Sequence, residues 1–247
     1  MKTGISLISA LAVFSAIVSL VESRKCSILQ VYGANNKIGT GFGVFNDGSV
    51  PRTGSSGDAG ADSASFSAGD NPHPVCGSVP KLRGHVVNVE EFVQKAIQEG
   101  LPTVYPNGSV VIKAFQINRE GGGPMKCEYS QDATGNSWQP MDVTLNMPGN
   151  FGLENNERTQ YQVVTTFKAG SQANGKNQNV ALVRCRAGVD GNCGGCFAVQ
   201  LNGVVVQADG QDNMPSSPNS DLGLTSQQMS TLVAKVINIA HEEHVVA

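Results

Sequence analysis

The chain has 247 residues, of which 40% are hydrophobic, 15% charged and 6% aromatic, and its formal net charge is -3. This hydrophobic fraction with so small a net charge excludes a disordered or fibrous chain. Because 17 Lys and Arg residues are outnumbered by 20 Asp and Glu residues, the balance also argues against a nucleic-acid partner. The 29 glycines and the low charge indicate a loop-rich, strand-rich extracellular domain.

The N-terminus has the pattern of a secretory signal peptide. Lys2 precedes an apolar, uncharged stretch over residues 5–20, and short side chains occupy the positions that a signal peptidase reads before Arg24. We therefore expect a signal peptide over residues 1–23 and a secreted protein. A membrane anchor is the alternative, but the stretch is short for a span and serines interrupt it.

The cysteines follow this segment, and an even number in a secreted chain predicts up to three disulfides. Their pairing stays open, because spacing alone does not determine connectivity. A redox-active Cys193–Cys196 pair is the alternative, but no βαβ pattern surrounds it. Asn107 begins the only glycosylation sequon and lies in a predicted exposed turn. The cysteines are Cys26, Cys76, Cys127, Cys185, Cys193 and Cys196.

In chain order, the first half predicts two strands, a long loop and a helix. Residues 27–32 and 38–45 are typical of strands. Residues 46–74 are a predicted loop, since their composition shifts to Asp, Gly, Ser, Ala and Pro. A helix is predicted over residues 89–99, with Asn88 as its N-cap and an apolar face repeating every three to four residues.

The second half predicts strands. β-branched residues and Asn-Gly turns mark them, and Asn202-Gly203 is the best hairpin turn in the sequence. Seven or more strands with a single early helix predict a mainly β, disulfide-bonded β-sandwich over residues 24–210. The expected strands cover residues 109–118, 141–145, 161–167, 179–185, 197–201 and 204–207.

The tail changes character. Residues 211–224 predict a linker rich in Pro, Ser and Asn, and the final segment, 225–247, predicts a helix over residues 226–240. We expect its apolar stripe to dock on the domain, because its polar face lacks the Lys and Arg of a membrane-surface helix. The stripe consists of Met229, Leu232, Val233, Val236, Ile237 and Ala240.

No motif in the sequence assembles a catalytic, metal or cofactor site, so we expect none. His241 and His244 are three residues apart, whereas zinc needs three or four ligands. There is no Gly-x-Ser-x-Gly elbow. A glycoside hydrolase with paired carboxylates stays open as the alternative, although nothing in the sequence selects a pair. The acidic candidates are Glu90, Glu91, Asp142, Glu154 and Glu157.

Two side chains and one turn are candidate contacts for a ligand such as a sugar polymer. Trp138 offers a flat ring for stacking, and Arg52 is the lone cation of an acidic stretch. The glycines before Pro124 would let a backbone approach closely. The alternative is structural: Trp138 fills the core, and Arg52 pairs with Asp47, Asp58 or Asp62. The glycines are Gly121, Gly122 and Gly123.

An ordered series of short motifs resembles the Egh/MAS family of secreted fungal virulence factors associated with appressoria. The series departs from the family pattern at Glu120 and Ala181, and in the Cys193–Cys196 pair. The series comprises Gly39-Thr-Gly-Phe-Gly-Val44, Pro51-Arg52-x-Gly54, Val75-Cys-Gly77, Gln116-Ile-Asn118, Gly121-x-Gly123-Pro124-x-x-Cys127, Asp132-Ala-Thr-Gly135-x-x-Trp138 and Leu182-Val-Arg-Cys185.

The resemblance implies a virulence-associated protein that acts at host surface penetration, without established catalytic residues. We expect it to be non-catalytic and to contact a cell-wall polysaccharide or another host surface component. The alternative is a diverged carbohydrate-active enzyme. The general look is also similar to copper-dependent polysaccharide monooxygenases, but their copper site needs an N-terminal histidine, and no histidine precedes His73. Oligomeric state is left open.

Overall fold

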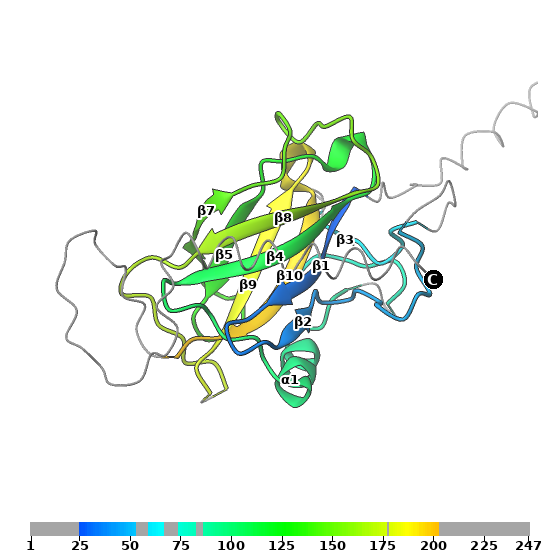
Figure 1. Cartoon of the computed structure of the whole chain (residues 1–247). Coiled ribbons are helices and arrows are strands. Elements are labelled where there is room, and N and C mark those ends of the chain that lie inside the picture. Colours follow the sequence, from blue (N-terminus) through cyan, green and yellow to red (C-terminus); the bar gives the residue numbers. More distant parts are fainter. Residues whose placement is uncertain (1–24, 53–58, 67–73, 83–85, 177, 203–247) are drawn as a thin grey trace, which may run out of the picture. The chain divides into compact units, whose positions relative to one another are not determined.

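A computed structural model describes residues 25–52, 59–66, 74–82, 86–176 and 178–202. These residues form a mainly β fold with one α-helix, α1, which covers one side of the sheet (Figure 1). The strands are β1 (Cys26–Tyr32), β2 (Ile38–Thr40), β3 (Ala64–Ser65), β4 (Ser109–Gln116), β5 (Lys126–Ser130), β6 (Gln139–Pro140), β7 (Asp142–Leu145), β8 (Thr159–Thr166), β9 (Val180–Ala187) and β10 (Cys193–Gln200). The helical elements are α1 (Val89–Glu99) and the short 3-10 turns η1 (Arg119–Gly121) and η2 (Val189–Gly191).

Nine strands belong to one sheet with the order β6-β5-β9-β10-β1-β4-β8-β7, and β2 pairs with β1 beside this path. All pairings in it are antiparallel except that of β1 with β10. The first and last strands of the order, β6 and β7, are consecutive parts of one segment, residues 139–145. The sheet therefore curls until its two ends meet, which makes it nearly barrel-shaped.

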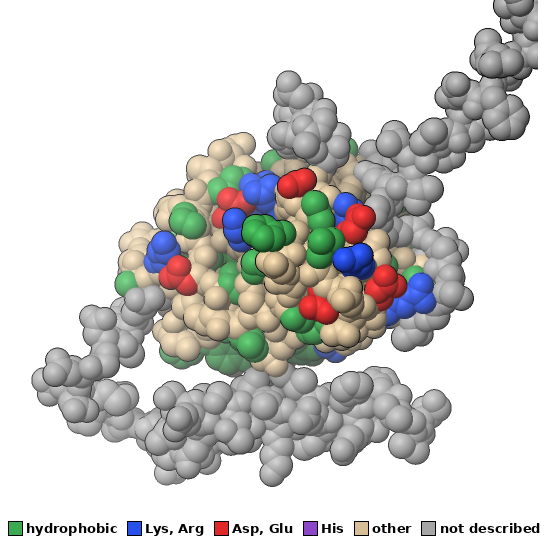
Figure 2. Space-filling model, turned by 90° about the horizontal axis from the view of Figure 1, so that it is seen from above, with side chains coloured by type: hydrophobic (Ala, Val, Ile, Leu, Met, Phe, Trp, Pro, Cys, Tyr) green, Lys and Arg blue, Asp and Glu red, His purple; other side chains and the backbone are tan. Residues whose placement is uncertain are grey.

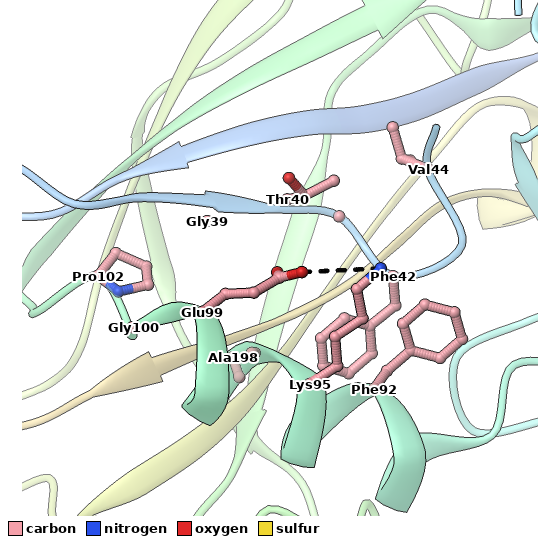
Figure 3. A pocket seen from close by; sticks show the side chains of 12 residues that line it. Gly39, Thr40, Phe42, Val44, Phe92, Lys95, Glu99, Gly100, Pro102 and Ala198 are labelled. Atoms are coloured by element: carbon pink, nitrogen blue, oxygen red, sulfur yellow. Dashed lines mark ion pairs between the residues drawn. The ribbon is translucent and has the colours of Figure 1, made fainter. Parts of the chain in front are cut away.

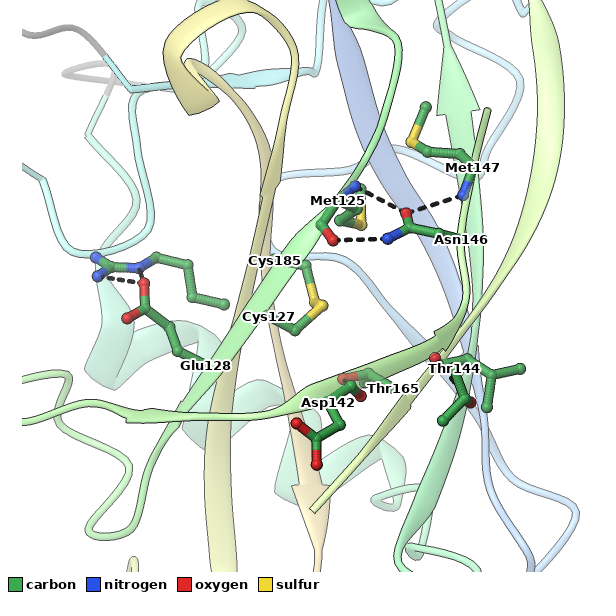
Figure 4. The surroundings of a disulfide bond; sticks show 11 residues. Met125, Cys127, Glu128, Asp142, Thr144, Asn146, Met147, Thr165 and Cys185 are labelled. Atoms are coloured by element: carbon green, nitrogen blue, oxygen red, sulfur yellow. Dashed lines mark hydrogen bonds and ion pairs between the residues drawn. A yellow bond between two sulfur atoms is a disulfide. The ribbon is translucent and has the colours of Figure 1, made fainter. Parts of the chain in front are cut away.

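The residues around β7 hold the two ends together (Figure 4). The Met141 N–H donates to Cys127 O at 2.9 Å, which ties the segment to β5. Asn146 accepts from Met125 N at 2.7 Å and donates to Met125 O at 2.9 Å. On the other side, Thr165 Oγ1 in β8 donates to Asp142 O at 3.1 Å.

The predicted sandwich of two sheets is not confirmed, because all described strands except the two-residue β3 form this single curled sheet. Two packed sheets and one curled sheet share the same strand pattern in sequence. The two folds differ in which edge strands pair. Strand β6, which lies at one edge of the sheet here, is only two residues long and has no recognisable strand pattern in the sequence.

Most predicted elements are confirmed. The helix is Val89–Glu99, with Asn88 as its N-cap: the Glu91 N–H donates to Asn88 Oδ1 at 3.3 Å. Strand 38–45 is shorter than predicted and ends at Thr40, because Gly41 approaches β1 so closely that a Cβ would lie 2.0 Å from Ile28 O. The signal peptide, strand 204–207, the linker and the C-terminal helix lie outside the described residues.

The core lies on both faces of the sheet. One cluster, which includes Ile112, Val163 and Phe197, fills the inside of the curl. A second cluster lies on the outer face of β9 and β10, under α1 and residues 64–66, 75–82 and 87. This double burial explains why β10 is buried along almost its whole length.

Candidate functional site

The predicted aromatic contact, Trp138, lies between β5 and β6 and is half-buried. The Arg184 guanidinium carbon is 3.9 Å from the centroid of its ring, so a cation from β9 covers one face of the indole. The rest of the ring packs at the border of the second core cluster. Trp138 thus packs against the core with part of its ring and leaves another part accessible to solvent.

Arg184 belongs to a row that we call the arginine–aromatic strip: Trp138, Arg184, Glu128, Arg186 and Phe66. Glu128 Oε1 accepts from Arg184 Nε at 2.9 Å and lies 3.5 Å from Arg186 Nη2. The Arg186 guanidinium lies 5.9 Å from the centroid of the Phe66 ring. Burial lowers the pKa of Arg184, and the Glu128 carboxylate counteracts that shift. The strip therefore joins β5, β9 and the long loop through mutually satisfied charges and rings.

Arg52 forms a two-pronged ion pair with Asp62, whose side chain is fully buried. The same carboxylate accepts from the Phe45 N–H at 2.9 Å. Asp62 is one of the three structural partners that the sequence offered for Arg52. In this position, Arg52 neutralises a buried charge and holds the long loop.

Gly121, Gly122 and Gly123 are buried. The close backbone approach expected of them takes place within the chain, since a Cβ on Gly121 would lie 1.8 Å from Lys25 O and one on Gly123 would lie 2.1 Å from Met147 O. The predicted contacts therefore have neighbours within the chain: Trp138 stacks with Arg184 of β9, and Arg52 binds Asp62. Gly121 packs against Lys25, and Gly122 and Gly123 pack against residues 147–154.

The structure exposes one aromatic residue that the sequence reasoning missed. The side chain of Phe151 is 84% exposed at the tip of the loop that packs on these glycines. A signal was present in the sequence, because Gly149-Asn-Phe-Gly152 has the composition of a tight turn around a large apolar residue.

A groove runs between β2 and α1 (Figure 3). Phe42 and Phe92 stack in its wall with ring centroids 5.4 Å apart. The ion pair Lys95–Glu99, at 3.8 Å, lies along its helical side. Its lining is mostly glycine, alanine and apolar side chains, with these charges on one side only.

The six cysteines form three disulfides: Cys26–Cys193, Cys76–Cys196 and Cys127–Cys185. Cys193 and Cys196 therefore do not bond to each other. Asn107 is exposed in the turn before β4, where its Oδ1 accepts from the Ser109 hydroxyl at 2.7 Å. Its glycosylation stays a prediction.

The described residues contain no group of three or more His, Cys, Asp or Glu side chains arranged to hold a metal ion. All four histidines lie outside the described residues. Of the acidic candidates, Glu90 pairs with Lys176 at 2.9 Å, and Glu154 accepts from the Asn155 N–H at 2.8 Å. None of the helices in the described part of the chain has the length and apolar character of a membrane span.

Fold and surface together define a disulfide-crosslinked, single-sheet β protein with exposed and half-exposed aromatic residues. Residues 23–194 match the family model described as Egh16-like virulence factor, and the chain belongs to this family. The resemblance seen in the sequence motifs is thereby confirmed.

Two relatives from Pyricularia oryzae carry related names. The chain is 29% identical to "Appressoria-specific virulence factor GAS1" over 182 residues, which cover 72% of each chain. It is 30% identical to "Appressoria-specific virulence factor GAS2" over 112 residues, which cover 42% of this chain and 39% of the relative. No solved structure matches the chain.

Proposed function

We propose that this protein is a secreted fungal virulence factor that acts where an appressorium penetrates the host surface, and that it binds a cell-wall polymer without catalysis. The observation that carries the proposal is the family match over residues 23–194. The proposed place of action, the appressorium, is taken from the name of GAS1, which is similar to this chain over 72% of both chains.

Secretion is supported by the three disulfides, because such bonds persist in oxidising compartments and are rare in the cytosol. We expect protein recovered from the culture medium to begin after Ser23 and to contain no free thiol. Intact mass with and without reduction tests both points. A product that begins at Met1, or one that carries six alkylated thiols without reduction, would contradict secretion through a cleaved signal.

The non-catalytic part of the proposal is supported by two carboxylates beside the proposed contacts, which both form ion pairs with arginines. The carboxylates of Asp62 and Glu128 hold arginines in place and belong to the framework. Trp138, Arg52 and the turn Gly121–Gly123 remain proposed contacts, and Trp138 is the one with a partly open ring. Trp138→Ala tests the ring directly.

Two experiments test the proposal. Deletion of the gene should reduce penetration of intact host tissue while infection through wounds stays normal, because the proposed role is confined to surface entry. Purified protein should bind insoluble chitin or cellulose without releasing soluble or oxidised sugars. Metal-dependent or hydrolytic release of sugars would instead favour a carbohydrate-active enzyme.

A further inference from the structure

The loop between β7 and β8 ends in a two-residue hairpin that points an aromatic ring outward. Asn150 and Leu153 pair through two backbone hydrogen bonds of 2.9 and 3.0 Å. The turn residues between them, Phe151 and Gly152, have φ angles of 50° and 82°. In Figure 1 this loop is the yellow-green one at the top, above the end of the curled sheet.

Folding requirements do not explain a phenylalanine at this position. A turn with two positive φ angles favours Asn or Gly at the first site, and a bulky side chain there is unfavourable. The ring is also 84% exposed, so it gains almost no burial. Phe151 is thus disfavoured both by its backbone and by its solvation, which indicates selection for something other than stability.

The hairpin is fixed in place by the glycine turn behind it. The Gly122 N–H donates to Gly152 O at 2.9 Å, the Gly152 N–H donates to Gly123 O at 3.0 Å, and the Gly123 N–H donates to Pro148 O at 2.7 Å. A Cβ on Gly152 would lie 2.1 Å from the Gly188 carbonyl carbon, so η2 supports the other side. Because this backbone is fixed before binding, binding through the ring orders no further loop.

The segment around the hairpin is rich in exposed amides, and the neighbouring η1 turn, which a Glu154 N–H to Arg119 O hydrogen bond ties to it, carries charges of both signs. Asn150, Asn155 and Asn156 are exposed, and within the described part of the chain no hydrogen bond involves their side-chain amides. Glu120 pairs with Lys25 at 3.1 Å. Figure 2 shows this end of the molecule with hydrophobic, acidic and basic side chains intermingled among polar ones.

We infer that the Phe151 hairpin is a binding site for a neutral polysaccharide. The ring would stack on the apolar face of a sugar, and the amides would exchange hydrogen bonds with its hydroxyls, since each amide both donates and accepts. The mixture of charges gives no preference for an anionic ligand or an anionic membrane surface. The inference rests on the proposed polymer-binding function and names the site and the class of ligand.

Phe151→Asn tests this inference without threatening the fold. Asn suits a positive φ better than Phe, so the melting temperature should stay the same or rise. Binding to insoluble chitin or cellulose should weaken roughly fivefold to tenfold, the range expected for one lost stacking contact. Phe151→Tyr keeps the ring and should bind like the wild type. Ile38→Thr removes a different exposed apolar side chain, from β2, and should leave binding unchanged.

The outcomes separate this site from the general proposal. If the wild type binds a polysaccharide and Phe151→Asn binds equally well, the hairpin is not the site, although the function stands. If the wild type binds neither polymer, the binding part of the proposed function fails, and the inference fails with it. Retention by phosphatidylcholine vesicles instead of polysaccharide, lost in Phe151→Asn, would overturn the ligand class in favour of a membrane.

Discussion

Asp132 shows how one carboxylate organises the turn that leads to Trp138. Its Oδ1 accepts from the Ser130 hydroxyl at 2.7 Å, the Thr134 hydroxyl at 2.8 Å and the Thr134 N–H at 3.0 Å. Ala133 and Gly135 in the same turn adopt positive φ angles of 59° and 79°. The Asp-Ala-Thr-Gly motif is therefore a hydrogen-bonded turn, and it needs no ligand to explain it.

The hydrogen bond from Ser130 lowers the pKa of Asp132 below its ordinary value of 3.8, and the bonds from Thr134 add to this. A lowered folded-state pKa stabilises the protein above the ordinary value and loses that effect as the pH falls through the folded value. We predict that Asp132→Asn lowers the free energy of unfolding by about 0.5–1 kcal/mol at pH 6, since solvent screens this exposed group.

The difference between Asp132→Asn and the wild type should shrink as the pH falls from 3.8 through the lower folded-state pKa, where the wild-type carboxylate becomes neutral. Urea unfolding at pH 6, 4 and 3 measures it. Asp190→Asn, at an exposed residue of η2, is the control for removal of an exposed carboxylate. A difference that grows in acid would contradict this assignment.

At the scale of elements, the fold depends on the segment that joins the two ends of the sheet. Asn146 is the side chain that best represents this closure, because its Oδ1 accepts from both Met125 N and Met147 N while its Nδ2 donates to Met125 O. Met125 and Met147 are buried, so the groups that bind Asn146 have little access to replacement water.

We predict that Asn146→Ala lowers the free energy of unfolding by about 2–4 kcal/mol, because it leaves two buried N–H groups and one carbonyl unpaired. Chemical denaturation of purified protein measures the change. Asn136→Ala, at an exposed position in a turn, is the matched control and should change stability by less than about 0.5 kcal/mol. Equal effects of the two substitutions would contradict the role given to Asn146.

Elements with local signals could be predicted, and those fixed by distant pairing could not. Helix Val89–Glu99 has its own cap and apolar period, and strand Ser109–Gln116 is rich in β-branched residues. Strand β5 was missed, because Lys126–Ser130 alternates around a cysteine without a β-branched residue. Strand β10 was predicted only from Phe197, since Cys193-Gly-Gly-Cys196 resembles a loop until its partner β9 is known.

The candidate site was predicted in part. The sequence identified Trp138, but not the guanidinium of Arg184 on its ring, since that contact joins residues far apart in the chain. It also identified Gly121–Gly123 as a close approach, whereas the approaching backbone belongs to Lys25 and to residues 147–154 of the same chain. The tight turn around Phe151 is marked locally by Gly149 and Gly152, whereas the exposure of its ring depends on how this loop packs on Gly122 and Gly123.

At the scale of the whole molecule, two of the three disulfides attach distant parts of the chain to β10. Cys26–Cys193 spans 167 residues, and Cys76–Cys196 spans 120 residues. Cys127–Cys185 spans 58 residues and joins β5 to β9, where the two cysteines are already paired in the sheet. The first two bonds therefore fix tertiary arrangement, and the third reinforces strands that other hydrogen bonds also hold.

The Cys76–Cys196 bond is the covalent anchor of residues 59–66 and 74–82, which also pack on the curled sheet through the second core cluster and through the Phe66 N–H to Asn192 O hydrogen bond of 2.9 Å. We predict that a Cys76→Ala/Cys196→Ala double variant keeps its sheet and becomes sensitive to protease between residues 59 and 82. Global stability should fall by about 2–5 kcal/mol. Limited proteolysis with mass mapping locates the first cuts, and far-UV circular dichroism reports the sheet.

Cys127→Ala/Cys185→Ala is the matched control: it should lose a comparable amount of stability without early cleavage in this region. Early cleavage at the same sites in both variants would mean that this loop is released by general destabilisation and that Cys76 does not anchor it.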